Sequence, residues 1–368
     1  MSDVDKSKLS PMMLQYFEIK EKYMDVILFF RLGDFYEMFF EDAYTASHEL
    51  ELTLTGKNAG LDDRIPMCGV PHHAVNVYLD RLIDKGYKVA ICEQVEDPKD
   101  AKGVVKREVL QVITKGTIMN SESLDENSNN YIGNIIDLKH AYIVCYADIS
   151  TGEFNLMIID HNSDKLLIEI LSLGLNEVVI NNNFDSSIID ILKNRYKITI
   201  SIYDNEIDTS EYKSIYNNID DERYVIATKH LLSYLIDTQK RSLSHLQQIK
   251  VVDNKSYLKM DVNTKRNLEL TESLRLKSRN YSLLWLLDKT KTAMGSRLLK
   301  QFIEQPLVNI EEINKRQNII ENLLEEFILK EELKALLFEV YDLERLCGRI
   351  GYGNTNGRDW LQLKNSLK

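Results

Sequence analysis

Apolar positions in the first hundred residues follow two different spacings, and each spacing predicts a local structure. Short apolar runs predict strands at Val26 to Phe30, Ile65 to Val70 and Tyr87 to Gln94. Apolar residues three and four apart predict helices at Met12 to Lys22 and Val75 to Lys85. Strand and helix patterns therefore alternate, which indicates a mixed α/β domain.

The middle of the chain begins with three strand-like runs in succession. They cover Tyr131 to Leu138, Ala141 to Ile149 and Glu153 to Ile159, and the connections between them are short enough for hairpins. Helical and strand patterns alternate after them to about Ile202, and Asp221 to Gln239 predicts a helix. Three meandering strands followed by βα units favour a ribonuclease-H-like layout.

The pattern from about Ser256 onward is helical. Asn309, with Glu312 three residues later, resembles a capping box that opens a helix over Ile310 to Leu324. Five apolar residues predict one buried stripe on it: Ile313, Ile320, Leu323, Leu324 and Phe327. The sequence stops within a further helical pattern, so we expect a truncated helical domain.

These patterns divide the chain into three expected domains and a linker. The mixed α/β domain is expected over residues 1–117, and a polar stretch rich in Asn and Ser, residues 118–130, is expected to be an exposed linker. Residues 131–245 are the expected α/β, ribonuclease-H-like domain. Residues 246–368 are the expected start of an all-α domain, so the fold class is multidomain.

Composition is typical of a globular protein of the reducing cytosol. Of the 368 residues, 44% are hydrophobic and 28% charged, enough for the cores of two or three domains. The longest apolar run has about seven residues, far fewer than the roughly twenty of a membrane helix, and the polar N-terminus has no signal core. The four cysteines lie far apart, without CxxC spacing. We therefore expect a cytoplasmic location and no membrane partner.

Charge limits how the chain could bind nucleic acid. It has 57 acidic and 46 basic residues and a net charge of -11, which opposes a phosphate backbone. Binding must then depend on local patches or shape, and the segment from Lys99 to Lys115 holds five basic and two acidic residues. His72 and His73 have no partner at metal-ligand spacing, so we interpret them as structural.

The most informative motif is FFRLGDFYEMFF, residues 29–40. In an extended segment Phe35 and Glu37 project from the same face, and the turn at Gly33-Asp34 places them near a domain edge. A phenyl ring can wedge between base steps at a cost of a few kcal/mol, and a carboxylate can hydrogen-bond a displaced base. The same pattern also fits an amphipathic strand with a core Phe and a solvated Glu.

Several long motifs resemble the bacterial DNA mismatch-repair MutS family. In the first domain they are GDFYEMF, the run IPMCGVPHHAVNVYLDRLIDKGYKVAICEQVEDP and the tail KGVVKREVLQVITKGT. Later in the chain they are TKRNLELTESLR, SLLWLLDKTKTAMGSRLLKQFIEQPL and GRIGYGNTNGRDWLQL. The resemblance spans nearly the whole chain, although residues 131–245 match in layout more than in motif.

The resemblance implies that the chain recognises mismatched or unpaired bases in duplex DNA and so initiates mismatch repair. By resemblance, Phe35 stacks on a mispaired base in the minor groove and Glu37 hydrogen-bonds to it. The weaker candidates for DNA contact are Met67, Lys57, Asn58 and Arg107. Met67 fits a core position equally well, and Lys57 and Asn58 fit a solvated loop equally well.

The resemblance also implies cofactors and partners. The family's ATPase and clamp domains lie beyond this chain, so we expect no catalytic, cofactor or metal residue here, and ATP with Mg only in the full-length parent. A P-loop is also absent near Lys57, where Glu51 and Asn58 break the motif. The expected partners are mismatched duplex DNA, at the nucleoid, and MutL through residues 131–245. The full-length parent is expected to be a homodimer, whereas the chain alone could be a monomer.

Two alternatives stay open on the residues alone. Asp148 in YADIST, with Glu153 nearby, resembles the first carboxylates of a metal-dependent nuclease. Such a site needs a further converging carboxylate, and Glu169 and Glu177 fall at uncertain register. The middle domain could instead be only a protein-docking module.

Overall fold

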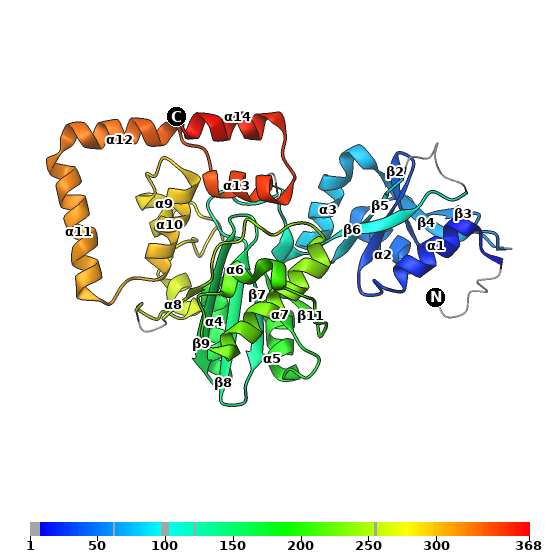
Figure 1. Cartoon of the computed structure of the whole chain (residues 1–368), viewed down its shortest axis with the longest axis horizontal. Coiled ribbons are helices and arrows are strands. Elements are labelled where there is room, and N and C mark those ends of the chain that lie inside the picture. Colours follow the sequence, from blue (N-terminus) through cyan, green and yellow to red (C-terminus); the bar gives the residue numbers. More distant parts are fainter. Residues whose placement is uncertain (1–7, 62, 97–102, 121–122, 254–255) are drawn as a thin grey trace. The chain divides into compact units, whose positions relative to one another are not determined.

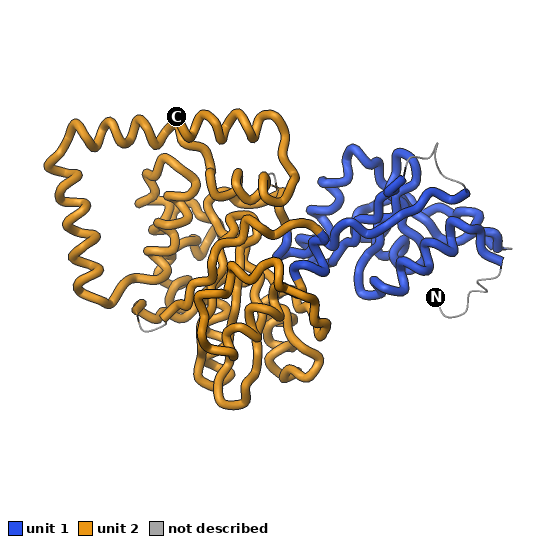
Figure 2. The backbone as a smooth tube through the Cα atoms, in the orientation of Figure 1, with its two compact units in different colours: residues 1–117, 235–240 blue, residues 118–234, 241–368 orange. Residues whose placement is uncertain are grey.

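The structure, a computed structural model, describes residues 8–61, 63–96, 103–120, 123–253 and 256–368 (Figure 1). The chain forms two compact units. Unit 1 comprises residues 1–117 and 235–240, and unit 2 comprises residues 118–234 and 241–368 (Figure 2). No helix of the described residues is long and apolar enough to cross a membrane.

Unit 1 is built on a sheet with the strand order β3-β4-β2-β1-β5-β6 in its described part. The strands are β1 (Ile27–Leu32), β2 (Phe35–Phe39), β3 (Thr55–Lys57), β4 (Ile65–Pro71), β5 (Val89–Gln94) and β6 (Arg107–Ile113). The helices are α1 (Pro11–Lys20), α2 (Phe40–Leu50) and α3 (Val75–Asp84). Strand β1 pairs in parallel with β5 and antiparallel with β2. The predicted mixed α/β content is confirmed.

Successive strand residues point to opposite faces of this sheet, and apolar side chains occur on both faces. Helices therefore cover both faces. On one face α1 packs Tyr16 edge-on against Phe30 and Phe39, with ring centroids 5.5 and 5.0 Å apart. On the other face the Cys68 thiol of β4 donates to the Ala43 carbonyl of α2. The central strands β1 and β2 are therefore mostly buried, and the most exposed residue of β2 is Phe35 at its start.

The sheet of unit 2 has the order β11-β10-β7-β8-β9-β12 in its described part. Its strands are β7 (Ile132–Asp137), β8 (Ala141–Asp148), β9 (Glu153–Asp160), β10 (Glu177–Ile180), β11 (Thr199–Ile202) and β12 (Lys250–Val251). The helices around it are α4 (Ser163–Leu173), α5 (Ser186–Asp190), α6 (Lys213–Tyr216) and α7 (Glu222–Gln239), of which the residues from Leu235 onward belong to unit 1. The predicted three-stranded meander is confirmed in β7, β8 and β9, and β10 and β11 follow as parallel strands.

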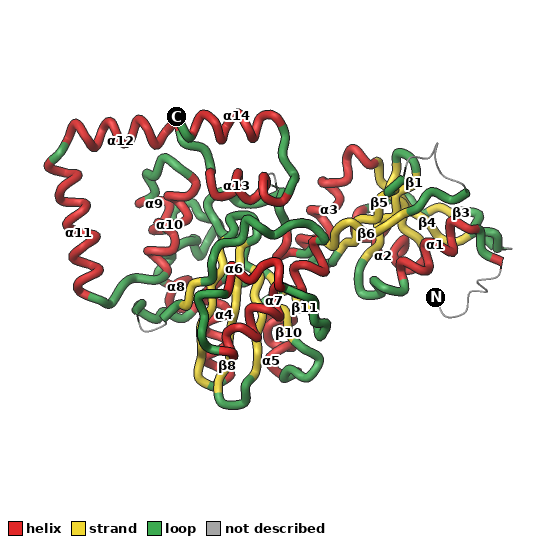
Figure 3. Tube along the Cα trace, viewed as in Figure 1, coloured by secondary structure: helices red, strands yellow, loops and turns green. Residues whose placement is uncertain are grey.

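The rest of unit 2 is mainly helical (Figure 3). Its helices are α8 (Val262–Asn267), α9 (Leu283–Leu287), α10 (Ala293–Glu304), α11 (Ile310–Glu325), α12 (Phe327–Glu339), α13 (Leu343–Tyr352) and α14 (Gly357–Ser366). Asn309 Oδ1 accepts from the backbone N–H of Glu311 and Glu312, so α11 begins where the sequence predicts.

The predicted buried stripe of α11 is wrong. Ile320, Leu324 and Phe327 are 57, 65 and 63% exposed, and no residue of α11 is buried within the described structure. Periodicity identifies a helix face that could be buried, but it does not supply the element that buries it.

The segment predicted to be an exposed linker is hydrogen-bonded to helices of unit 2 in its described part. Arg297 donates to the Glu126 carbonyl at 3.0 Å, and Arg345 donates to the carbonyls of Asp125 and Ser128 at 2.9 and 2.7 Å. Asn130 is only 7% exposed. The backbone of this polar segment therefore binds arginines of α10 and α13 instead of lying free in solvent.

The four cysteines are free thiols with contrasting surroundings. Cys68, Cys92 and Cys145 are buried, and Cys347 is exposed. Burial raises the pKa of the Cys68 and Cys92 thiols to about 12.

Candidate nucleic-acid interface

The hairpin between β1 and β2 carries Phe35 to the surface of unit 1. Gly33, at φ +59°, supplies the left-handed backbone of the turn. Leu32 and Phe35 are cross-strand partners directly after it. The Asp34 carbonyl accepts from the His72 N–H at 2.8 Å, which ties the turn to the segment after β4.

Successive residues of β2 alternate between the two faces of the sheet. Tyr36 and Met38 point into the core and are 3 and 0% exposed. Phe35 shares the opposite face with Phe39, but Phe39 is fully buried whereas Phe35 is 48% exposed. Phe35 is therefore not a core residue, and the interpretation of it as one is wrong.

Glu37 lies beside Phe35 on the same face and pairs with Lys57 of β3. The Lys57 Nζ donates to Glu37 Oε2, and the two side chains are 28 and 16% exposed. The ammonium also lies 5.7 Å from the centre of the Phe39 ring. Gly69 stands opposite Glu37 on β4, and a Cβ there would lie 3.5 Å from the Glu37 Cγ. Glu37 is thus a half-buried, paired carboxylate, so the simple solvated Glu of the amphipathic-strand interpretation is not observed.

Met67 and Asn58 occupy the neighbouring strand and loop. Met67 is half-buried and packs against the core cluster beneath α1. Its Sδ accepts from Thr55 Oγ1 at 3.7 Å. Asn58 is exposed, and its Oδ1 accepts from the Gly60 N–H at 3.1 Å, which holds the loop after β3. A contact of either residue with DNA stays a prediction.

Arg107 is held inside unit 1 and does not form part of an open surface. It is 7% exposed, and its guanidinium donates to the Arg31 carbonyl, Gln15 Oε1 and the Val105 carbonyl at 2.7 to 3.1 Å. Its Cζ lies 5.0 Å from the centre of the Phe30 ring. These contacts make Arg107 part of the framework of unit 1, and a contact of Arg107 with DNA stays a prediction.

The predicted basic patch around Arg107 is weaker than its composition indicates. Lys99 and Lys102 lie outside the described residues. Lys106 is exposed, but its Nζ lies 2.6 Å from Glu108 Oε1, so its charge is locally offset.

Three matches with protein families cover most of the chain. The model of MutS domain I matches residues 10–122, that of MutS domain II matches residues 130–247, and that of MutS domain III matches residues 263–368. The DNA mismatch repair protein MutS of Bacillus licheniformis is 52% identical over 359 residues, which are 98% of this chain and 41% of that relative. The proteins of the same name from Oceanobacillus iheyensis and Bacillus subtilis strain 168 are each 50% identical, over 98% of this chain and 42% of each relative.

The chain belongs to the MutS family. It spans about two fifths of the length of these curated relatives. Phe35, Glu37, Met67, Lys57 and Asn58 all lie within the match to MutS domain I.

A polar cluster behind the hairpin of this MutS-family chain was not found by sequence reasoning. The Tyr36 hydroxyl donates to Glu93, and the Arg31 Nη1 lies 3.6 Å from Glu93 Oε1. Burial and the neighbouring Glu93 carboxylate raise the pKa of Tyr36, so its hydroxyl stays protonated as a donor. His72 is exposed, with Nε2 4.0 Å from Glu93. Arg31 and Tyr36 are direct cross-strand partners. The two-residue turn at Gly33-Asp34 sets this register, so the turn was the sequence signal from which their contact could have been predicted.

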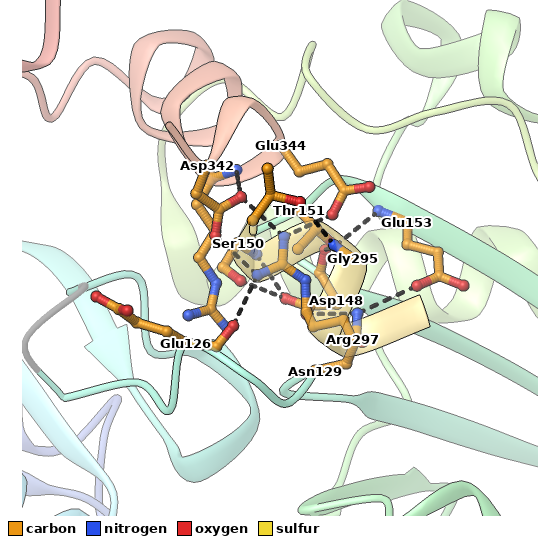
Figure 4. Close-up of polar contacts among 12 residues, drawn as sticks. Glu126, Asn129, Asp148, Ser150, Thr151, Glu153, Gly295, Arg297, Asp342 and Glu344 are labelled. Carbon is orange, nitrogen blue, oxygen red and sulfur yellow. Dashed lines mark hydrogen bonds and ion pairs between the residues drawn. The ribbon is translucent and has the colours of Figure 1, made fainter. Parts of the chain in front are cut away.

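The match to MutS domain II contains Asp148 and Glu153 of the nuclease alternative, and side chains and backbone of the same chain hydrogen-bond to both (Figure 4). Asp148 is fully buried and accepts from Asn129 Nδ2, the Asn130 N–H, and the N–H and hydroxyl of Ser150 at 2.7 to 3.1 Å. Glu153 accepts from Asn129 Nδ2, Tyr131 and Asn155.

The other acidic candidates do not complete a metal site. Glu177 is fully buried and accepts from Ser201 and Tyr234. Glu169 forms an ion pair with Lys259. The described residues contain no group of three metal-ligating side chains. The geometry therefore does not favour the nuclease alternative.

Proposed function

We propose that this chain is the mismatch-recognising part of a DNA mismatch-repair protein. Unit 1 binds duplex DNA that contains mispaired or unpaired bases, Phe35 enters the minor groove and stacks on the mispaired base, and Glu37 hydrogen-bonds to it. The observation that carries this proposal is the 48% exposure of Phe35 at the tip of a hairpin whose other aromatic residues are buried. The match to MutS domain I, and relatives named for DNA mismatch repair, support it.

The wedge has a physical reason to select mismatches. Unstacking a base step costs a few kcal/mol, and less where the base is mispaired, because less pairing and stacking is lost. An exposed ring on a well-hydrogen-bonded strand recovers part of that free energy by stacking on the displaced base, about 1–3 kcal/mol. The same ring gains little from a matched duplex, whose bases remain stacked on one another.

The net charge of the chain fits recognition by shape better than recognition by charge. At -11 it repels the phosphate backbone at long range, and in the basic segment near Arg107 the charge of Lys106 is offset by its ion pair with Glu108. We expect weak binding to matched DNA, so that discrimination depends on the hairpin.

The rest of the chain is proposed to connect recognition with later steps. We assign MutL docking to residues 131–245, within the match to MutS domain II, and we expect the homodimer and the Mg-dependent ATPase only in the full-length parent. Asp148 accepts from four protein donors and Glu153 from three, which supports a docking role for this region over metal binding.

The test replaces Phe35 with alanine and measures fluorescence anisotropy on G·T, unpaired-T and matched duplexes at one stated salt concentration. We expect Phe35→Ala to weaken binding of the mismatched duplexes roughly 5- to 150-fold, the loss of one base–aromatic contact, and to leave matched binding almost unchanged. Tyr44→Ala, which removes a ring that is 50% exposed on α2, is the matched control. It should alter the affinity for neither the mismatched nor the matched duplexes.

Thermal melting distinguishes the wedge from a structural role. A ring that is half in solvent contributes little packing, so Phe35→Ala should melt close to the unchanged protein. A loss of about 3–5 kcal/mol, as for a core Phe, or an unchanged affinity for all three duplexes would contradict the proposal.

A further inference from the structure

The ion pair between Lys57 and Glu37 joins two strands that are not neighbours. Strand β4 lies between β3 and β2, so the Lys57 side chain reaches across β4 to the carboxylate. Gly69, directly opposite Glu37 on β4, has no side chain to occupy that path. The Lys57 ammonium is also positioned against the buried Phe39 ring, 5.7 Å from its centre. The pair is therefore built into the sheet face that carries Phe35.

We propose that Lys57 is a charge-exchange residue, which neutralises Glu37 in the DNA-free protein and releases it when a DNA phosphate binds the ammonium. The inference rests on the proposed function of Phe35 and Glu37 and deepens it. Lys57 acts through Glu37 and is a positioning residue as well as a phosphate ligand.

Electrostatics gives the exchange its direction. A bare carboxylate that approaches a minor groove is repelled by phosphates, whereas the paired Lys57 and Glu37 approach as a nearly neutral unit. A phosphate offers the ammonium a replacement partner of the same charge as Glu37. The released carboxylate is then stabilised only if a base supplies a hydrogen-bond donor. On a mismatch such a donor is present, whereas on matched DNA the donors are already paired.

The exchange predicts that the two residues are not independent in DNA binding. With Glu37 present, the free energy that Lys57 gains from a phosphate is reduced by the free energy of the ion pair that it gives up. With Gln at position 37 nothing is given up, so Lys57 contributes its full phosphate contact. Loss of Lys57 should therefore weaken mismatch binding more in the Glu37→Gln protein than in the unchanged protein.

The experiment is a double-mutant cycle of Lys57→Met and Glu37→Gln, measured on a G·T duplex over a range of salt concentrations. Methionine keeps an unbranched apolar stem next to Phe39 and removes the charge. We expect Lys57→Met to weaken binding two- to fivefold more in the Glu37→Gln background, the contribution of a partly exposed ion pair. In that background Lys57→Met should also reduce, by about one, the slope of the log binding constant against the log salt concentration. Lys57→Arg should restore most of the binding.

The matched control is the pair Lys85 and Glu49, which is also in unit 1 and is 46 and 20% exposed. The cycle of Lys85→Met and Glu49→Gln should show no coupling in DNA binding. All variants should melt close to the unchanged protein, so that an affinity change reports binding and not unfolding.

Two results would overturn the inference. Equal losses on removal of Lys57 in both backgrounds would make it an independent phosphate contact, and a loss only when Glu37 is present would make it a structural partner that never leaves. The Phe35→Ala variant keeps these outcomes separate from the proposed function. If Phe35→Ala abolishes mismatch preference while the cycle is additive, only the charge exchange fails; if Phe35→Ala has no effect, the proposed function fails.

Discussion

Glu37 in unit 1 and Asp148 in unit 2 are both carboxylates on strands, and the sequence offers each as part of a functional site. Their surroundings differ. Glu37 is partly exposed beside an open phenyl ring and pairs with a lysine that other anions can attract. Asp148 is fully buried and accepts hydrogen bonds from four donors of its own chain. A carboxylate whose acceptors are all used by the protein stabilises the fold, whereas one with a single exchangeable partner can bind a ligand.

The largest expected effect tests the Asp148 side of this comparison. Asp148→Asn leaves one acceptor oxygen where the carboxylate had two, so buried donors lose their partners. We expect a loss of unfolding free energy on the order of 3 kcal/mol, measured by chemical denaturation. Asp160→Asn, at an exposed ion pair with Lys165, is the control and should change stability by less than about 1 kcal/mol.

The same variant can break the comparison. If Asp148→Asn is as stable as the unchanged protein but abolishes a Mg²⁺-dependent cleavage of duplex or RNA–DNA hybrid substrates, then Asp148 is catalytic and saturation by protein donors is not a sign of a structural role.

A second, smaller effect concerns Arg107, a buried cation among exposed ones. Arg107→Met removes hydrogen bonds to the Arg31 and Val105 carbonyls and should lower the free energy of unfolding by about 1–3 kcal/mol. Lys106→Met, at the exposed pair with Glu108, should leave stability unchanged. If Arg107→Met is instead stable, and the slope of log binding constant against log salt concentration falls by about one, Arg107 is a phosphate contact.

The smallest effect is the response of unit 2 to acid. Burial alone would raise the pKa of Asp342, but the hydrogen bonds and charge of Arg297 outweigh it and lower the pKa below its ordinary value. A lowered folded pKa means that this stabilisation is present above the unfolded pKa and is lost as pH falls through the folded one. The free energies of unfolding of the unchanged protein and of Asp342→Asn, measured by chemical denaturation across that acid range, should converge at low pH. Parallel curves would contradict the assignment.

Local pattern predicted the elements of the fold well, because alternation and helical spacing record which face is buried. The strand at Phe35 and the cap at Asn309 follow from such patterns. Partners distant in sequence could not be predicted in the same way. The pairing of Lys57 with Glu37 depends on the register of β3 on β4, and the burial of Arg107 depends on β6 beginning near the Arg31 carbonyl.

Composition was least informative where polar residues hydrogen-bond to buried groups. Asn129 and Asn130 indicated a solvated linker, yet they supply donors to Asp148. The exposed apolar residues of α11 show the converse, since an apolar stripe is not by itself a core.

The contrast among the four thiols makes selective chemical labelling practical. Maleimides react with thiolates, and the buried Cys68 and Cys92, with pKa values of about 12, supply almost none at neutral pH. Cys145 is buried as well, so Cys347 is the exposed thiol left to react. A single dye can therefore be attached to α13 of the unmodified sequence, remote in sequence from Phe35 and Lys57, and every variant above can be titrated with unlabelled duplexes by its fluorescence.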